Sequence, residues 1–211
     1  MRAKNIRYIH GVGIDLRKYK QRNAKDRNSE LRLKLGIPLN AKVLLSVGEL
    51  NINKNHGVVI RGIEQLQKWD VYYVICGDGI LKEYYKRLAE NLGIANRFIL
   101  AGFCNNVQDY YRMADVFCLP SFREGIPSSI MEAMAMGIPV IASNIRGIRD
   151  IIMDYKYLFN PHDVVDLVKT IKMSLTYYPK SIIEQNIRML RCYEFNYVVT
   201  ELMQVYSLFS G

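Results

Sequence analysis

Short, uninterrupted apolar segments recur along the chain, and longer amphipathic segments separate them. An apolar run without polar alternation is typical of a strand that is buried on both faces of a sheet. Five segments have this character, with boundaries at residues 43–48, 71–77, 97–100, 116–120 and 139–143. Runs of this length fit strands better than helices, so we expect at least five strands.

Before, between and after these strands, apolar residues recur at the three- and four-residue spacing of helices. The predicted helices cover residues 29–35, 55–68, 80–92, 107–113 and 128–136 and, beyond Pro161, residues 163–175, 182–193 and 197–208. Alternating strands and helices build a parallel sheet with helices on both faces. We therefore expect an α/β fold over residues 41–211, a Rossmann-like doubly wound parallel sheet that ends in helices.

The composition indicates one compact domain with a short extension. The chain has 211 residues, half of them apolar, which is enough for a core of its own. No run is long enough to span a bilayer and no signal peptide opens the chain, so we expect a cytoplasmic protein. The cysteines lack CxxC or metal-binding spacing, and we expect reduced, buried thiols at Cys76, Cys104, Cys118 and Cys192.

Positive charge is concentrated at the start of the chain. The formal net charge is +9, and residues 1–40 hold eleven Lys or Arg and three acidic residues. We interpret residues 1–40 as a basic N-terminal segment or linker, either solvated or in peripheral contact with an anionic membrane surface. Because this segment has few aromatic residues, we do not expect a nucleic-acid partner.

The stretch 121–143 carries the clearest chemical signal. Gly125 allows the backbone to approach a ligand closely, and Pro127 suits the first turn of a helix. The amide and hydroxyl groups of Ser128 and Ser129 then face a ligand at the positive end of the helix dipole. This arrangement favours a negatively charged group, such as a diphosphate, at the start of the helix.

Two carboxylates and one lysine extend this candidate site. Glu132 can accept hydrogen bonds from a ribose diol, and Glu124 can accept them from sugar hydroxyls. Lys54 can balance phosphate charge. For each of the three, an ordinary solvated surface charge is the alternative. Because ligands bind beyond the carboxyl ends of parallel strands, we expect three loops to converge there, at residues 48–55, 102–106 and 121–132.

Other motifs disfavour several classes of enzyme. Gly77 and Gly79 lack the third glycine of a dinucleotide fingerprint, so we interpret CGDG as a tight strand-to-helix turn and do not expect NAD. His10 and His56 have no partners at metal or triad spacing, and we expect a structural or solvent-exposed role for each. No GxSxG nucleophile motif occurs.

Several spaced motifs together resemble the donor-binding half of retaining glycosyltransferases of group 1, also called family 4, which adopt the GT-B fold. The matching motifs are GVGID, SVGELNINKNH, ICGDG, ILAGF, EGIPSSIME, EAMAMGIPVIAS and RGIRD. The forms EL-N-NKNH and RGIRD are most similar to the branch that serves capsule and exopolysaccharide assembly. The resemblance covers nearly the whole chain.

The resemblance implies a role for each residue of the candidate site. Glu124 would be the catalytic residue, in contact with the donor sugar beside the reacting carbon, and Glu132 would bind the ribose. Lys54 would hold the diphosphate and offset its charge as it leaves. The other donor-binding positions would be Gly48, the base-binding loop at Phe103 and Cys104, and the helix start at Gly125, Ile126, Pro127, Ser128 and Ser129.

Two features of the motif bear on cations. Family members commonly pair the donor-site lysine with an arginine at the position that Glu49 occupies here. The resemblance therefore gives no support for Glu49 as a phosphate ligand and leaves its role open, and Lys54 is the one evident cation. The site has no DxD-type carboxylate pair, so the resemblance implies no metal and no cofactor. The nucleotide sugar would be a substrate.

The resemblance implies glycosyl transfer with retention, from a nucleotide-diphosphate sugar to a saccharide or lipid-linked acceptor in bacterial-type polysaccharide biosynthesis. The family favours UDP over GDP. We expect the N-terminal, acceptor-binding domain of such enzymes to be missing from this chain. One alternative is therefore an isolated nucleotide-sugar-binding module without catalysis. A nucleotide-sugar epimerase of similar architecture is a third alternative, which the EGIPSSIME motif disfavours.

Overall fold

The structure is a computed structural model that describes residues 13–19 and 29–207. Within these ranges the chain forms one six-stranded parallel sheet in the order β3-β2-β1-β4-β5-β6. Most strand residues are buried, because helices cover both faces of the sheet. The expected doubly wound α/β fold is confirmed. The strands are β1 (Lys42–Val47), β2 (Val71–Cys76), β3 (Phe98–Gly102), β4 (Val116–Leu119), β5 (Val140–Ser143) and β6 (Leu158–Phe159).

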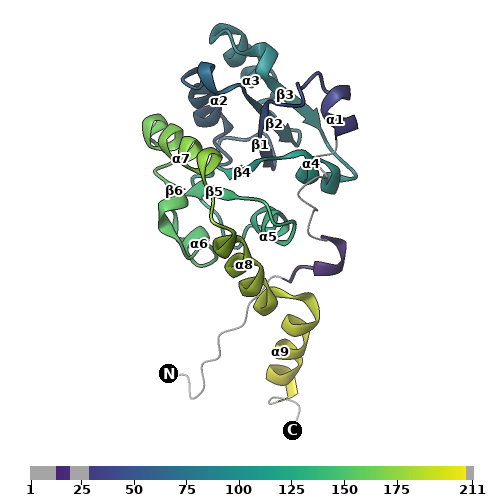
Figure 1. Cartoon of the computed structure of the whole chain (residues 1–211). Coiled ribbons are helices and arrows are strands. Elements are labelled where there is room, and N and C mark those ends of the chain that lie inside the picture. The colour runs from purple at the N-terminus through teal and green to yellow at the C-terminus, as the bar shows by residue number, and fades with distance from the viewer. Residues whose placement is uncertain (1–12, 20–28, 208–211) are drawn as a thin grey trace.

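The helices form two layers around the sheet (Figure 1). One layer and its core cluster are built by α2 (His56–Glu64), α3 (Lys82–Asn91) and α7 (Val164–Thr176). The other contains α1 (Ser29–Lys34), α4 (Val107–Met113), α5 (Ser128–Ala135), α6 (Arg146–Arg149) and α8 (Lys180–Met189). Helix α9 (Phe195–Ser207) follows α8 and extends away from the sheet. Single 3-10 turns lie at Leu16–Lys18, Gln67–Trp69, Ala95–Arg97, Tyr155–Tyr157 and Leu190–Tyr193.

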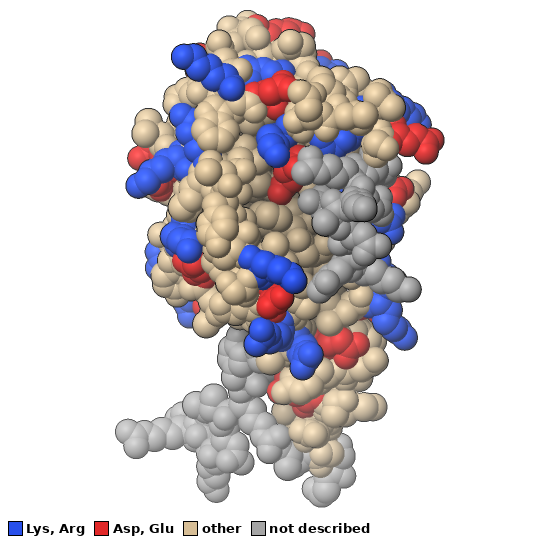
Figure 2. Space-filling model, viewed as in Figure 1, with Lys and Arg blue, Asp and Glu red and all other residues tan. Residues whose placement is uncertain are grey.

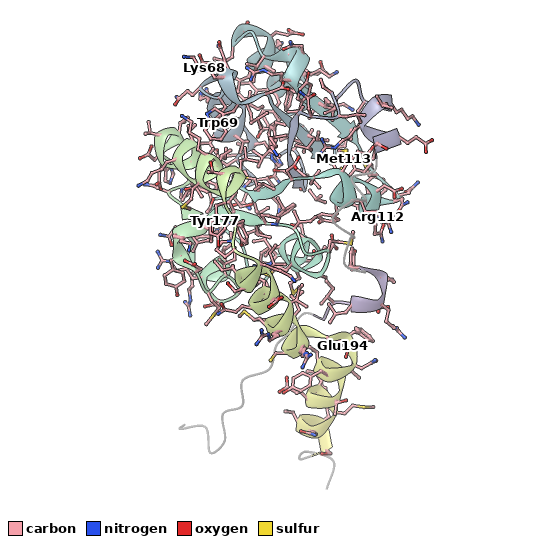
Figure 3. The ribbon with its side chains drawn as sticks, in the orientation of Figure 1. Lys68, Trp69, Arg112, Met113, Tyr177 and Glu194 are labelled. Atoms are coloured by element: carbon pink, nitrogen blue, oxygen red, sulfur yellow. The ribbon has the colours of Figure 1, made fainter. Side chains whose placement is uncertain are left out.

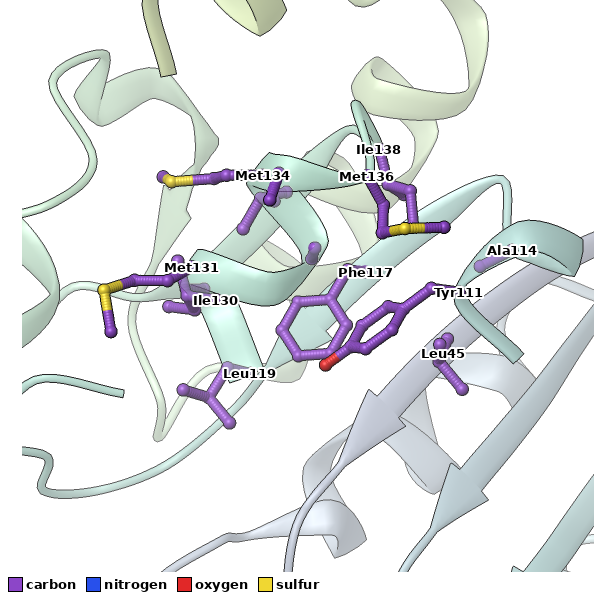
Figure 4. Packing of buried hydrophobic residues seen from close by; sticks show 14 of the residues in the cluster. Leu45, Tyr111, Ala114, Phe117, Leu119, Ile130, Met131, Met134, Met136 and Ile138 are labelled. Atoms are coloured by element: carbon purple, nitrogen blue, oxygen red, sulfur yellow. The ribbon is translucent and has the colours of Figure 1, made fainter. Parts of the chain in front are cut away.

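Helix α5 is buried on nearly all sides, which fixes the position of its first turn. Figure 4 shows its residues Ile130, Met131 and Met134, all at most 1% exposed, on the same side of the rings of Tyr111 and Phe117. Those two ring centroids lie 5.7 Å apart. Flexible methionine side chains fill the irregular gaps of such a core.

The boundaries differ from the sequence prediction where elements are short. Helix α6 and strand β6 were not predicted, because four and two residues respectively are too few to show a period. Helix α2 ends at Glu64, before the predicted end at residue 68, and a separate 3-10 turn follows. Lys68 and Trp69 of that turn are labelled in Figure 3. The expectation of a buried thiol is confirmed for Cys76 and Cys118, but Cys104 is only half-buried and Cys192 is exposed.

Described residues before position 40 pack against the sheet domain. The buried guanidinium of Arg32, in α1, donates to the carbonyls of Ala41 and Met113 and to a carboxylate oxygen of Asp115. Figure 3 labels Met113 at the end of α4, beside α1. Ile14 donates to the Tyr193 carbonyl at 2.7 Å. The domain boundary at residue 40 stays a prediction, and His10 lies outside the described residues.

Surface charges of both signs are mixed on the face that Figure 2 shows, without one large patch of a single sign. In the part of the chain that the structure describes, no helix is both long and apolar enough to cross a membrane.

Candidate functional site

The loops that follow β1 and β4 lie against each other at the carboxyl edge of the sheet, as predicted. The Phe122 amide donates to the Asn53 carbonyl at 2.8 Å, and the Asn53 side-chain amide donates to the Arg123 carbonyl at 2.8 Å. Two adjoining cavities open at this edge, and both are lined by Val47, Gly48, Glu49 and Glu132. We call them the polar cavity and the Phe103 cavity.

The polar cavity, of about 360 Å³, contains the predicted charged residues. Its remaining lining residues are Lys54, Glu124, Ile126, Pro127, Ser128 and Ser129. Lys54 Nζ lies 2.7 Å from Glu124 Oε1, and the two side chains are 20% and 12% exposed. The lysine stem packs over Gly48, where an added Cβ would lie 3.3 Å from Lys54 Cε. In the described chain, therefore, the lysine expected to bind phosphate and the expected catalytic carboxylate form an ion pair.

The start of α5 faces the polar cavity. Pro127 is the residue immediately before the helix, rather than part of its first turn as predicted, because the helix begins at Ser128. The first N–H groups of a helix have no partner in a preceding turn, and the side chain of Pro127 provides no cap. Ser129 is buried and Ser128 is exposed. Together with the helix dipole, these amides favour an anion in the cavity.

The Phe103 cavity, of about 440 Å³, is lined mainly by apolar surface. Besides the four shared residues it contains Cys76, Gly77, Asp78, Phe103, Cys104 and Val107. The Phe103 side chain is 82% exposed at the cavity. An exposed aromatic ring beside backbone groups suits a flat, partly polar ligand group.

The CGDG motif forms the tight turn that the sequence predicted. Its backbone lies so close to the β1 loop that a Cβ on Gly77 would approach the Gly48 carbonyl oxygen to 1.9 Å. Gly79 is similarly constrained by Leu50. Both glycines are therefore required for packing, and they place the β2 loop against the Phe103 cavity.

Glu132 stands between the two cavities and is held by tyrosines. The Tyr111 hydroxyl donates to Glu132 Oε2 at 2.8 Å. Burial raises the pKa of the Glu132 carboxyl, and hydrogen bonds from Tyr111 and Tyr19 oppose that rise. Burial also raises the pKa of the Tyr111 hydroxyl, which therefore stays protonated and able to donate. An oriented carboxylate of this kind can accept hydrogen bonds from a pair of hydroxyl groups.

Sequence reasoning missed Tyr19, Tyr111 and Gly147. The two tyrosine rings pack edge to face with their centroids 6.4 Å apart, although Tyr19 comes from the segment interpreted as a linker. A Cβ on Gly147 would lie 2.0 Å from the Gly125 carbonyl oxygen, so α6 packs directly against the loop that carries Glu124. Only the RGIRD motif signalled Gly147, and no local pattern signalled either tyrosine.

Of the remaining positions discussed from the sequence, Glu49 lines the cavities and Gly125 does not. Gly125 lines neither cavity, and no atom lies within 4 Å of a Cβ added there, so its proposed approach to a ligand stays a prediction. Glu49 accepts a hydrogen bond from the Asn51 amide at 2.9 Å and lines both cavities. The polar cavity is thus lined by three carboxylates and one ammonium group among the described residues.

His56 has a structural environment. It is fully buried, and its Nδ1 lies 2.8 Å from the Tyr73 hydroxyl, which donates to Ser46 Oγ, which donates to the Cys118 carbonyl. These directions require a proton on Nδ1 of the imidazole. Burial lowers the pKa of His56 to about 3, so the ring is neutral at neutral pH. The expected structural role is therefore supported.

A third cavity, of about 480 Å³, lies beside the same loops and holds none of the predicted site residues. It is lined mainly by aromatic and apolar side chains, among them Ile52, Tyr84, Tyr85, Phe122 and His162, and also by Asn55 and Arg61. No group of three or more His, Cys, Asp or Glu side chains suited to a metal ion occurs among residues 13–19 and 29–207.

Comparison with known proteins matches this architecture to one family. The family described as "Glycosyl transferases group 1" matches residues 27–186. The chain is 32% identical over 148 residues to the putative glycosyltransferase EpsD of Bacillus subtilis, covering 69% of this chain and 39% of that protein. It is 34% identical over 141 residues to an Escherichia coli protein named UDP-Gal:alpha-D-GlcNAc-diphosphoundecaprenol alpha-1,3-galactosyltransferase, covering 64% and 36% respectively.

A solved structure confirms the fold. The crystal structure of Anabaena Alr3699/HepE in complex with UDP and glucose superposes with a TM-score of 0.79 and 24% identity, over 94% of this chain and 55% of that one. The chain therefore spans little more than a third of the length of the two curated relatives and about half of the solved structure.

Proposed function

The chain belongs to the group 1 family of glycosyltransferases, and from this premise we propose that it binds a nucleotide-diphosphate sugar for retaining glycosyl transfer. The observation that carries this proposal is the position of Glu132, which lines both the Phe103 cavity and the polar cavity. A nucleotide has its ribose between its base and its phosphates, so a ribose-binding carboxylate belongs at that junction.

The proposed donor extends across both cavities. The base lies in the Phe103 cavity against the loop of Phe103 and Cys104, and the ribose diol donates to Glu132. The diphosphate lies at the start of α5, where Lys54 and the amides of Ser128 and Ser129 favour negative charge. The sugar then lies over Glu124, the proposed catalytic residue.

The proposed reaction exchanges one bond at the anomeric carbon. The bond from this carbon to the diphosphate breaks, and its electron pair stays on the leaving diphosphate, whose charge Lys54 and the helix start stabilise. The acceptor hydroxyl oxygen forms the new bond, and its proton passes to the departing diphosphate. Among the compared proteins, a relative named for UDP-Gal and a structure with UDP and glucose support UDP as the nucleotide.

The proposed acceptor is a saccharide or a lipid-linked saccharide in polysaccharide assembly, with peripheral contact at a membrane. The name of the Escherichia coli relative, which includes a diphosphoundecaprenol, supports this class. Because both cavities are open and the relatives are longer, the acceptor would be oriented by protein beyond the described site. The second candidate function is donor binding without transfer by this chain alone. It is considered because the two open cavities do not by themselves orient an acceptor.

Calorimetric titration with UDP, GDP and their sugars tests the proposal. We expect UDP to bind, and Glu132→Ala to weaken binding by about 1.5–3 kcal/mol, the value of hydrogen bonds to a charged group. Glu83→Ala, on the exposed face of α3, is the matched control. A folded chain that binds none of these nucleotides would contradict both candidate functions. Assay of sugar transfer by the same chain separates the two.

A further inference from the structure

Asn55, the residue next to Lys54, precedes helix α2 but does not cap it with its side chain. Asparagine is a preferred N-cap residue because its side chain bonds to the free amides of the first turn. Asn55 precedes α2, yet its side chain makes no such bond. Its backbone has φ 50, in the left-handed region that asparagine tolerates better than most residues.

The Asn55 side chain instead connects two other loops. Its amide donates to the Pro120 carbonyl at 3.2 Å, at the end of β4, and to the Pro161 carbonyl at 2.9 Å, after β6. Pro120 begins the loop that carries Glu124. One side chain thus ties the Lys54 loop to the Glu124 loop and to a third loop at the same edge of the sheet.

Contacts of the neighbouring residues fix the backbone of Lys54 and leave its side chain as the part that can move. The Lys54 amide donates to Asn51 Oδ1 at 2.9 Å, which closes the loop on its other side. His56 is anchored beneath the loop through Tyr73. Ile52 and Phe122 line the third cavity, while Lys54 and Glu124 line the polar cavity. Alternate residues of the same two loops therefore line different cavities.

We propose that Asn55 is a positioning residue, which holds Lys54 opposite Glu124 and at the start of α5 by binding the Pro120 and Pro161 carbonyls. The inference rests on the proposed function, since the positioned ammonium group is the one assigned to the diphosphate. Asn55 itself lines the third cavity and does not line the polar cavity, so it acts through Lys54.

The test compares UDP with uridine, which lacks the diphosphate, in calorimetric titrations of the 211-residue chain. Asn55→Asp keeps the shape and the tolerance of positive φ but cannot donate, and Asn55→Gly keeps the backbone freedom without the amide. We expect either variant to weaken UDP binding about three- to tenfold and to leave uridine binding unchanged. Asn91→Asp, at the exposed end of α3, controls for the change in net charge, and Asn55→Gly tests the loss of the amide without any new charge.

A double-mutant cycle with Lys54→Ala separates positioning from general damage. If Asn55 acts through Lys54, the uncharged variant Asn55→Gly has almost no further effect on UDP affinity once Lys54 is alanine. An equal loss in both backgrounds, or wild-type UDP affinity in Asn55→Asp, would overturn the proposal. Failure of the unsubstituted chain to bind UDP would instead contradict the proposed function.

If the chain does not bind UDP, a measurement without nucleotide still tests whether Asn55 positions Lys54. The lysines are reductively methylated with ¹³C-labelled methyl groups and observed by NMR. The Lys54 signal is assigned by its loss in Lys54→Ala. Glu124→Gln should shift this signal in the wild-type background and leave it nearly unchanged in Asn55→Asp. A shift of the same size in both backgrounds would show that Asn55 does not hold the pair together.

Discussion

Lys54 and Glu124, seventy residues apart in the chain, form an ion pair of 2.7 Å across the polar cavity. The pair joins the loop after β1 to the loop after β4. Each partner is assigned to a different part of the proposed donor, the lysine to the diphosphate and the carboxylate to the sugar. A diphosphate must therefore compete with Glu124 for the ammonium group.

Glu124→Gln should strengthen the binding of UDP, which has no sugar for Glu124 to contact. Removing the carboxylate frees Lys54 and reduces the negative charge of the cavity. A partly exposed ion pair contributes up to about 1 kcal/mol, so we expect a gain of up to about fivefold in affinity. Sugar transfer should be lost in the same variant. Calorimetry that finds UDP bound more weakly would show that Glu124 does not oppose the phosphates.

Glu49→Gln should also strengthen UDP binding, and Glu49→Arg more so. Glu49 lines both cavities and brings a third carboxylate to a site with one lysine. We expect a change of about two- to fivefold for Glu49→Gln that shrinks as salt is added, because exposed charges are screened. Glu90→Gln, on the exposed surface of α3, is the control. If Glu49→Gln and the unsubstituted chain bind UDP with equal affinity at low salt, Glu49 does not interact electrostatically with the phosphates.

Glu132→Gln should stabilise the unliganded chain at neutral pH while weakening nucleotide binding. The folded state raises the pKa of Glu132 above its ordinary 4.5, mainly through burial. Such a carboxyl favours folding when it is protonated, and this contribution is lost as the pH rises through the folded pKa. The advantage of glutamine in thermal unfolding should therefore shrink as the pH falls toward 4.5. An advantage that grows toward acid pH would contradict the assigned direction.

The sequence was sufficient for five of the six strands and for the convergence of the site, because apolar runs and loop positions are local features. Lys54, Glu124 and Glu132 line the cavities as anticipated. The Lys54–Glu124 pair could not be anticipated, since both side chains were assigned to a ligand rather than to each other. Tyr19 and Arg32 were missed for another reason. Their partners, Glu132 and Asp115, lie far away in sequence, and no periodicity reports such contacts.

His56 should make the chain sensitive to acid. Burial lowers the pKa of His56 to about 3 from an ordinary 6.5, so the unfolded chain binds a proton that the folded chain rejects. Stability is full above pH 6.5 and falls as the pH drops toward 3, by at most about 1.4 kcal/mol per pH unit for this one group. Urea unfolding of His56→Gln should show a flatter dependence over this range. An unchanged slope would show that other groups dominate.

A crystal structure of the chain with UDP tests the central claim most directly. The account predicts the diphosphate at the start of α5 within hydrogen-bonding distance of Lys54 Nζ and the Ser128 and Ser129 amides. It also predicts the ribose hydroxyls on Glu132 and the base beside Phe103. A nucleotide bound instead in the cavity of Ile52, Tyr84 and Phe122, or bound with its ribose away from Glu132, would contradict it.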